Sequence, residues 1–210
     1  ISEQRPHAIC LNETFLDRSV ENVEIEGYVS IARWDRAVER GGVCIYARQD
    51  IAQQVTLLNK SGTAERLWCV LHTDCGPYLL GAWYRPPSVE VASIETCEKE
   101  HEQLSEGLMG TLLVGDINVH HLQWLKHSNE TSAGGKRMRL AAAQMGLKQV
   151  VGQPTRGSHL LDLVLTDMPG TTARVLPKIA DHCVVEASAP LPIPQLEVVL
   201  REGWKFSSAD

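Results

Sequence analysis

The sequence predicts an α/β (α+β) sandwich built mainly from strands, with two principal helices on the crossovers. Short apolar runs separated by Gly, Pro and Asp recur along the chain, and those rich in Val, Ile, Trp and Tyr are typical of strands. Many strands combined with few helices favour a layered packing of sheets and helices. The runs of the first half lie at 7–13, 41–48, 66–73, 78–85 and 111–116.

A change of spacing marks the first helix. Between 88 and 109 the apolar side chains recur every three or four residues, so they share one helical face. Ser93 is a candidate N-cap, and Gly107 or Gly110 is a candidate end. The other expected elements are a short one near 120–126, a helix at 136–145 ended by Gly146, and strands near 147–152, 160–166, 173–178 and 183–188.

Composition is that of one globular domain with a substantial core. The 210 residues are 43% hydrophobic and 22% charged, which excludes wholesale disorder. No apolar run approaches the roughly 20 residues of a membrane-spanning helix, and the start ISEQRPH lacks the parts of a signal peptide. The six cysteines form no C-x-x-C pair, which favours a reducing compartment. We therefore expect an intracellular, non-secreted protein with no membrane partner.

The formal net charge of −6 gives the chain no overall basic character. Many nucleic-acid-binding domains are strongly basic. A DNA-directed function must therefore rest on a site and on local basic residues.

Polar residues end or interrupt several apolar runs. Four carboxylates and one imidazole, far apart in sequence, predict one metal-assisted site assembled by folding. They are Glu13, Asp116, Asp162, Asp181 and His182.

Within this set, Asp116 and Asn118 are separated by one residue, so their side chains point to the same side of an extended segment. One could orient a water while the other hydrogen-bonds a phosphate oxygen. The alternative is a plain turn, which both residue types favour.

Seven ordered segments resemble the endonuclease/exonuclease/phosphatase superfamily, in particular the apurinic-endonuclease-like endonuclease domain of non-LTR (LINE-type) retrotransposons. The resemblance runs from about residue 6 to 190. The segments are ICLNET at 9–14, GGVCIYAR at 41–48, LLGAWYRPP at 79–87, LLVGDINVHH at 112–121, QPTRG at 153–157, LDLVLTD at 161–167 and ADHCVV at 180–185.

The resemblance implies a four-layer sandwich, with two mixed β-sheets packed face to face and helices outside. It also implies an opening strand with an Asn, and a helix, ahead of ICLNET, and we expect both to be absent from this chain. We therefore expect an N-terminally truncated domain at 1–190. A C-terminal connector at 191–210 would lead toward a reverse transcriptase domain of the same polyprotein.

The activity implied is a DNA endonuclease that depends on Mg²⁺, with Mn²⁺ as an alternative. It would nick DNA and leave a 3′-hydroxyl, as in target-primed reverse transcription, which places its action in the nucleus. The implied metal residues are Glu13 and Asp181, the implied catalytic residues are Tyr84, Asp116, Asn118, Asp162 and His182, and the implied phosphate contacts are Thr155 and Arg156.

In the implied mechanism, Asp116 positions the attacking water and Asp162 holds His182. Tyr84, Asn118 and His182 share the developing charge. Two alternatives stay open: a phosphatase of the superfamily, and a non-catalytic nucleic-acid-binding or scaffold remnant of the same fold. The HHxxW that follows GDIN, and QPTRG before LDLVLTD, favour the endonuclease.

Overall fold

The computed structural model describes residues 5–17, 19–36 and 41–193. Its largest sheet has six strands in the order β4-β5-β6-β7-β9-β8, and only β6 and β7 run parallel. The strands are β4 (Val55–Lys60), β5 (Glu65–Thr73), β6 (Gly76–Tyr84), β7 (Thr111–Asp116), β8 (Lys148–Gln149) and β9 (Asp162–Thr166).

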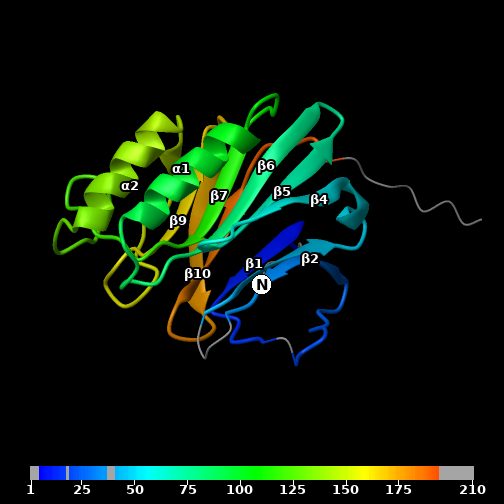
Figure 1. The fold of residues 1–210 in the computed structure, drawn as a ribbon, viewed down its shortest axis with the longest axis horizontal. Coiled ribbons are helices and arrows are strands. Elements are labelled where there is room, and N and C mark those ends of the chain that lie inside the picture. Colours follow the sequence, from blue (N-terminus) through cyan, green and yellow to red (C-terminus); the bar gives the residue numbers. More distant parts are fainter. Residues whose placement is uncertain (1–4, 18, 37–40, 194–210) are drawn as a thin grey trace, which may run out of the picture.

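Helices α1 (Ala92–Leu104) and α2 (Ala133–Gln144) cover one face of this sheet (Figure 1). Ile94 and Cys97 of α1 and Met138 of α2 are fully buried in the same core cluster as Trp68 of β5. Because successive strand residues face opposite sides, Cys69 points away from this cluster and into a second one.

The opposite face packs against a second layer of strands. This layer contains an antiparallel sheet in the order β1-β3-β2 and a separate antiparallel hairpin, β10–β11. Val43 and Ile45 of β3 share the second core cluster with Leu67 and Cys69 of β5. The strands are β1 (Ala8–Asn12), β2 (Tyr28–Trp34), β3 (Val43–Arg48), β10 (Thr172–Lys178) and β11 (Cys183–Ser188).

The α/β sandwich is therefore confirmed, with two differences from the expected layers. Over residues 5–17, 19–36 and 41–193, helices cover the large sheet on one side only, which makes three layers. Among these described residues β1 pairs only with β3 and β11 only with β10, so the second layer is split into two antiparallel sheets. The expected N-terminal truncation stays a prediction, and residues 194–210 of the expected connector lie outside the described residues.

Most expected elements are present, and the misses have physical causes. Strand β2 was missed because its half-exposed residues give no continuous apolar run, and β4 was missed because it is an exposed edge strand. Helix α1 has Val91 at its N-cap without a side-chain bond, because the hydroxyl of Ser93 donates to Glu90 O instead. Residues 120–126 form turns instead of a regular element.

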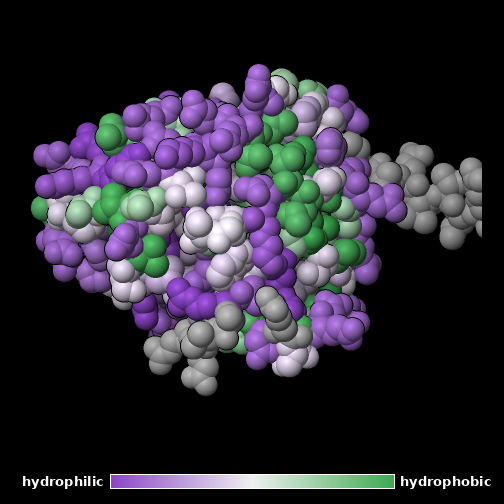
Figure 2. Space-filling view, viewed as in Figure 1, coloured by the Kyte–Doolittle hydropathy of each residue, from purple (hydrophilic) through white to green (hydrophobic). Residues whose placement is uncertain are grey.

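The two helices present a mainly hydrophilic surface, and hydrophobic side chains gather where β4, β5 and β6 run clear of them (Figure 2). Leu57 and Leu58 of β4 are among the exposed large hydrophobic residues. None of the helices in the described part of the chain is long and apolar enough to cross a membrane.

Candidate active site

The site lies at one edge of the large sheet, where β6 and β7 end side by side and β9 begins. The last residue of β7, Asp116, is the direct register partner of Asp162, the first residue of β9. A Cβ on Gly115 would lie 1.9 Å from Trp83 O, so only glycine fits between β7 and β6. This close fit brings the Asp116 carboxylate to the strand ends.

Asp116 and Asp162 carry like charges directly opposite each other in the sheet, which repel. His182 lies close to both carboxylates. Its Nδ1 lies 2.8 Å from Asp162 Oδ2, and its Nε2 lies 3.8 Å from Asp116 Oδ2. One ligand atom from each of the three residues lies within 4.8 Å of the other two. The expected pairing of Asp162 with His182 is therefore present in the structure.

The surroundings shift the proton affinity of this group. Burial, reinforced by the charge of Asp162, raises the pKa of Asp116 from 3.8 to about 7. The Asp162 carboxylate, which accepts a hydrogen bond from Nδ1, raises the pKa of His182. Asp116 can thus change protonation near neutral pH, and His182 holds a proton more tightly than a free imidazole, which suits acid–base chemistry.

Glu13 follows β1 and joins the site from the second layer. Its carboxylate accepts a short hydrogen bond from the Tyr84 hydroxyl, and its charge adds to the raised pKa of Asp116. Burial and this Glu13 contact raise the pKa of Tyr84, so the phenol stays protonated. Tyr84 therefore holds Glu13, whereas the sequence predicts a phosphate contact from its hydroxyl.

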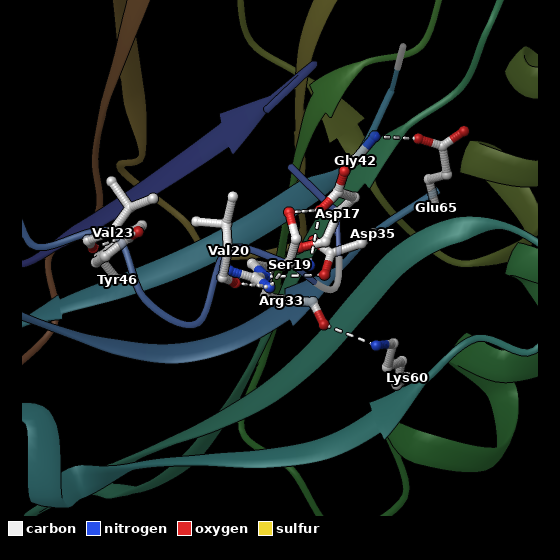
Figure 3. Close-up of polar contacts among 10 residues, drawn as sticks. All are labelled: Asp17, Ser19, Val20, Val23, Arg33, Asp35, Gly42, Tyr46, Lys60 and Glu65. Atoms are coloured by element: carbon white, nitrogen blue, oxygen red, sulfur yellow. Dashed lines mark hydrogen bonds and ion pairs between the residues drawn. The ribbon is translucent and has the colours of Figure 1, made fainter. Parts of the chain in front are cut away.

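The segment after Glu13 is anchored on β2 and β3, as Figure 3 shows. Arg33 donates to Val20 O at 2.7 Å and pairs with Asp35 at 2.9 Å. The Tyr46 hydroxyl donates to Val23 O at 2.9 Å. These bonds hold the backbone at Val20 and Val23 against β2 and β3.

Backbone strain also concentrates here. Of the four non-glycine residues with positive φ in the described part of the chain, Glu13 (φ 52°) and Asn118 (φ 48°) belong to the expected site. Such conformations cost about 1–3 kcal/mol and cluster at functional sites. Asn118 Nδ2 donates to Arg85 O at 3.1 Å.

Solved structures share this architecture, although no family model and no curated protein matches the sequence. The endonuclease domain of TRAS1, a telomere-specific non-LTR retrotransposon, aligns with TM-score 0.64 and 16% identity over 80% of this chain and 82% of its own. The catalytic domain of APE2 from Xenopus laevis aligns with TM-score 0.65 and 15% identity over 91% of this chain and 86% of its own.

The 3′ phosphatase NExo from Neisseria, bound to a product DNA hairpin, aligns with TM-score 0.58 and 14% identity over 89% of this chain and 90% of its own. The chain therefore shares the fold of these endonuclease and phosphatase domains, as the resemblance in sequence implies. At these identities the likeness concerns the fold.

Three residues that the sequence predicts to bind phosphate or metal lie differently in the structure: Thr155, Arg156 and Asp181. Thr155 is fully buried, and its Oγ1 accepts from the backbone N–H groups of Leu161 and Asp162 at 3.1 and 3.0 Å. No Thr155 surface is left for the expected phosphate contact, so that prediction is corrected. Asp181 is exposed and pairs with exposed Arg156 at 2.6 Å, outside the carboxylate–imidazole group of Asp116, Asp162 and His182.

Two charged residues of the site were missed from sequence. Glu65, 4% exposed, accepts from Gly42 N and pairs with Arg36 at 2.8 Å, and burial raises its pKa. Arg85 is 3% exposed and bonds to the segment that carries Asn118. The sequence signal that could have found them is a charged residue within an apolar strand or at its end. Burying such a charge costs free energy unless hydrogen bonds or an ion pair compensate it.

Proposed function

We propose that the protein is a divalent-metal-dependent DNA endonuclease that leaves a 3′-hydroxyl. One observation carries the proposal: His182 contacts two facing carboxylates, Asp162 at 2.8 Å and Asp116 at 3.8 Å. An imidazole oriented by one acid, beside a second acid with a pKa of about 7, can handle protons at a scissile phosphate.

In this mechanism Asp116 orients the attacking water and accepts its proton. A bond forms between the water oxygen and phosphorus while the bond from phosphorus to O3′ breaks, and O3′ takes up a proton from solvent water. His182, held by Asp162, and Asn118 donate hydrogen bonds to the phosphoryl oxygens as their charge grows. The products are a 5′-phosphate and a 3′-hydroxyl.

The donors of the site fit a hard divalent cation. Asp116 Oδ1 is buried without a hydrogen-bond partner in the described part of the chain, and Glu13 presents a carboxylate held by Tyr84. Oxygen ligands of this kind suit Mg²⁺ or Mn²⁺. Glu13 and Asp116 would hold the ion, and Asp181 could join them only by leaving Arg156. When bound, the ion neutralises charge on the phosphate.

Nicking of supercoiled plasmid tests the proposal. The protein should convert it to the open circle in Mg²⁺, and not in EDTA or with His182→Ala. The nicked ends should be extended by a polymerase without prior treatment, because they carry a 3′-hydroxyl. Absence of nicking by a folded protein in both Mg²⁺ and Mn²⁺ would contradict it and favour the non-catalytic remnant.

A second candidate, a 3′ phosphatase acting on DNA, is favoured by the likeness to NExo. A hairpin oligonucleotide with a 3′-phosphate separates the two. A phosphatase releases inorganic phosphate from it and leaves the plasmid intact, whereas the proposed endonuclease nicks the plasmid.

The likeness to the TRAS1 endonuclease domain supports a role in target-primed reverse transcription. In that role the partners are DNA and a reverse transcriptase domain of the same polyprotein, and the site of action is the nucleus. Expression of the domain in its polyprotein, with and without His182→Ala, would test the role through new insertions at genomic nicks.

A further inference from the structure

Arg85 is a buried cation beside the site, just after β6. It is 3% exposed, and burial lowers its pKa. Its guanidinium bonds only to neutral groups in the described part of the chain: the Ser93 hydroxyl at 3.1 Å and the carbonyl oxygens of Val89, Ile117 and Asn118. A buried charge without a counter-ion is costly, so its contacts must compensate.

Those contacts converge on the three residues that follow Gly115. Arg85 N donates to Asp116 O at 2.8 Å, and Nη1 lies 3.4 Å from Ile117 O and 3.5 Å from Asn118 O. In return Asn118 Nδ2 donates to Arg85 O at 3.1 Å. Arg85 therefore touches each residue of segment 116–118. The two carbonyl contacts are long, and the positive charge strengthens them.

Segment 116–118 needs such support. Asn118 has φ 48°, a left-handed conformation that costs free energy in a non-glycine residue, although Asn adopts it more readily than most. The other end of the guanidinium is anchored on Val89 O and Ser93 Oγ at the start of α1. Arg85 thus connects a strained loop to a helix that is packed in the core.

We propose that Arg85 is a positioning residue, which clamps segment 116–118 so that Asp116 and Asn118 face the scissile phosphate. The inference rests on the proposed endonuclease function. Because Arg85 is buried, it acts through these two residues and makes no contact with DNA. Its loss should therefore lower kcat and leave the KM for DNA nearly unchanged.

The test compares Arg85→Met, which keeps the apolar stem, with Arg85→Lys, which keeps the charge. The control is Arg137→Met, which removes an arginine that pairs with Glu98 on α1 away from the site. Nicking kinetics should show kcat lowered about tenfold to a hundredfold in Arg85→Met, as expected for a displaced catalytic group. Arg85→Lys should fall in between, and Arg137→Met should keep the wild-type kcat.

A second readout does not need activity. In ¹H–¹⁵N spectra the Asn118 side-chain amide is assigned by its absence in Asn118→Ala. Its signals should shift in Arg85→Met and stay in place in Arg137→Met. If the wild type does not nick DNA, the endonuclease proposal fails, while this spectrum still decides whether Arg85 holds Asn118.

Three outcomes would overturn the clamp. They are an unchanged kcat in folded Arg85→Met, unshifted Asn118 signals, and a raised KM with a weaker salt dependence, which indicates direct phosphate contact. Should Arg85→Met fail to fold, Arg85→Lys is measured in both assays. An Arg85→Lys variant with wild-type kcat and wild-type Asn118 signals would then overturn it.

Discussion

His182 donates a 2.8 Å hydrogen bond from Nδ1 to the Asp162 carboxylate, while its other nitrogen faces Asp116 at 3.8 Å. The two carboxylates are register partners on β9 and β7, so the imidazole reduces a repulsion that the sheet itself creates. The same contact orients the ring toward the strand ends. Stability and chemistry are therefore linked at this position.

His182→Ala and Asp116→Asn should each abolish nicking without unfolding the domain. Removing a catalytic group of this kind costs roughly two to four orders of magnitude in rate. Plasmid nicking and thermal melting check both variants. A variant with wild-type rate and wild-type melting temperature would remove that residue from the mechanism.

Asp162→Ala should lower both activity and stability, because it leaves a partly buried imidazole without its partner. We expect a loss of about 1–3 kcal/mol of unfolding free energy. Asp181→Ala is the matched comparison, since its ion pair with Arg156 is exposed and should contribute under about 1 kcal/mol. Equal melting temperatures for the two variants would show that Asp162 is not needed for stability.

Thr155→Val should lower stability although valine has nearly the same shape. Valine cannot accept from the N–H groups of Leu161 and Asp162, which leaves two buried donors unsatisfied. The expected cost is about 2 kcal/mol, or roughly 4–8 °C in Tm. Thr155→Ser, which keeps the hydroxyl acceptor, should have a Tm and a nicking rate close to those of the wild type. A Thr155→Val variant with unchanged Tm and weaker DNA binding would instead support the phosphate contact predicted from sequence.

Tyr84→Phe should weaken the apparent affinity for Mg²⁺, because its hydroxyl donates to Glu13. Loss of such a supporting hydrogen bond typically costs about 10–100-fold in metal affinity. Nicking measured against Mg²⁺ concentration should reach a near wild-type maximum at a higher concentration. A lowered maximum rate with unchanged Mg²⁺ dependence would assign Tyr84 to the phosphate.

Stability measured in EDTA should fall as the pH rises from 5 to 8. Asp116 has a folded pKa of about 7 against 3.8 in the unfolded chain, so its contribution is full below about pH 4 and disappears as the pH passes 7. The raised pKa of His182 acts in the same direction, above 6.5. Asp116→Asn should reduce this loss of unfolding free energy between pH 5 and 8 by on the order of 2 kcal/mol, or about 4–8 °C in Tm. Parallel wild-type and variant curves would contradict this origin.

The sequence by itself determined the sandwich class, the buried strands of both layers, the two helices and the residues of the carboxylate–imidazole group. Continuous apolar runs and strand-end polar residues are local patterns, so they can be read without coordinates. Edge strand β4 and half-exposed β2 lack such runs and were found only in the structure.

Tertiary structure alone decided which polar atoms meet. The register of β7 with β9 set Asp116 against Asp162, and folding buried the Thr155 hydroxyl beneath Asp162 and directed the Tyr84 phenol to Glu13. Arg85 also became part of the site only through contacts between β6, the start of α1 and segment 116–118. The physical reason is that the partners of a polar side chain depend on distance and burial. Strand register and layer packing set both, and neither can be predicted from local sequence patterns.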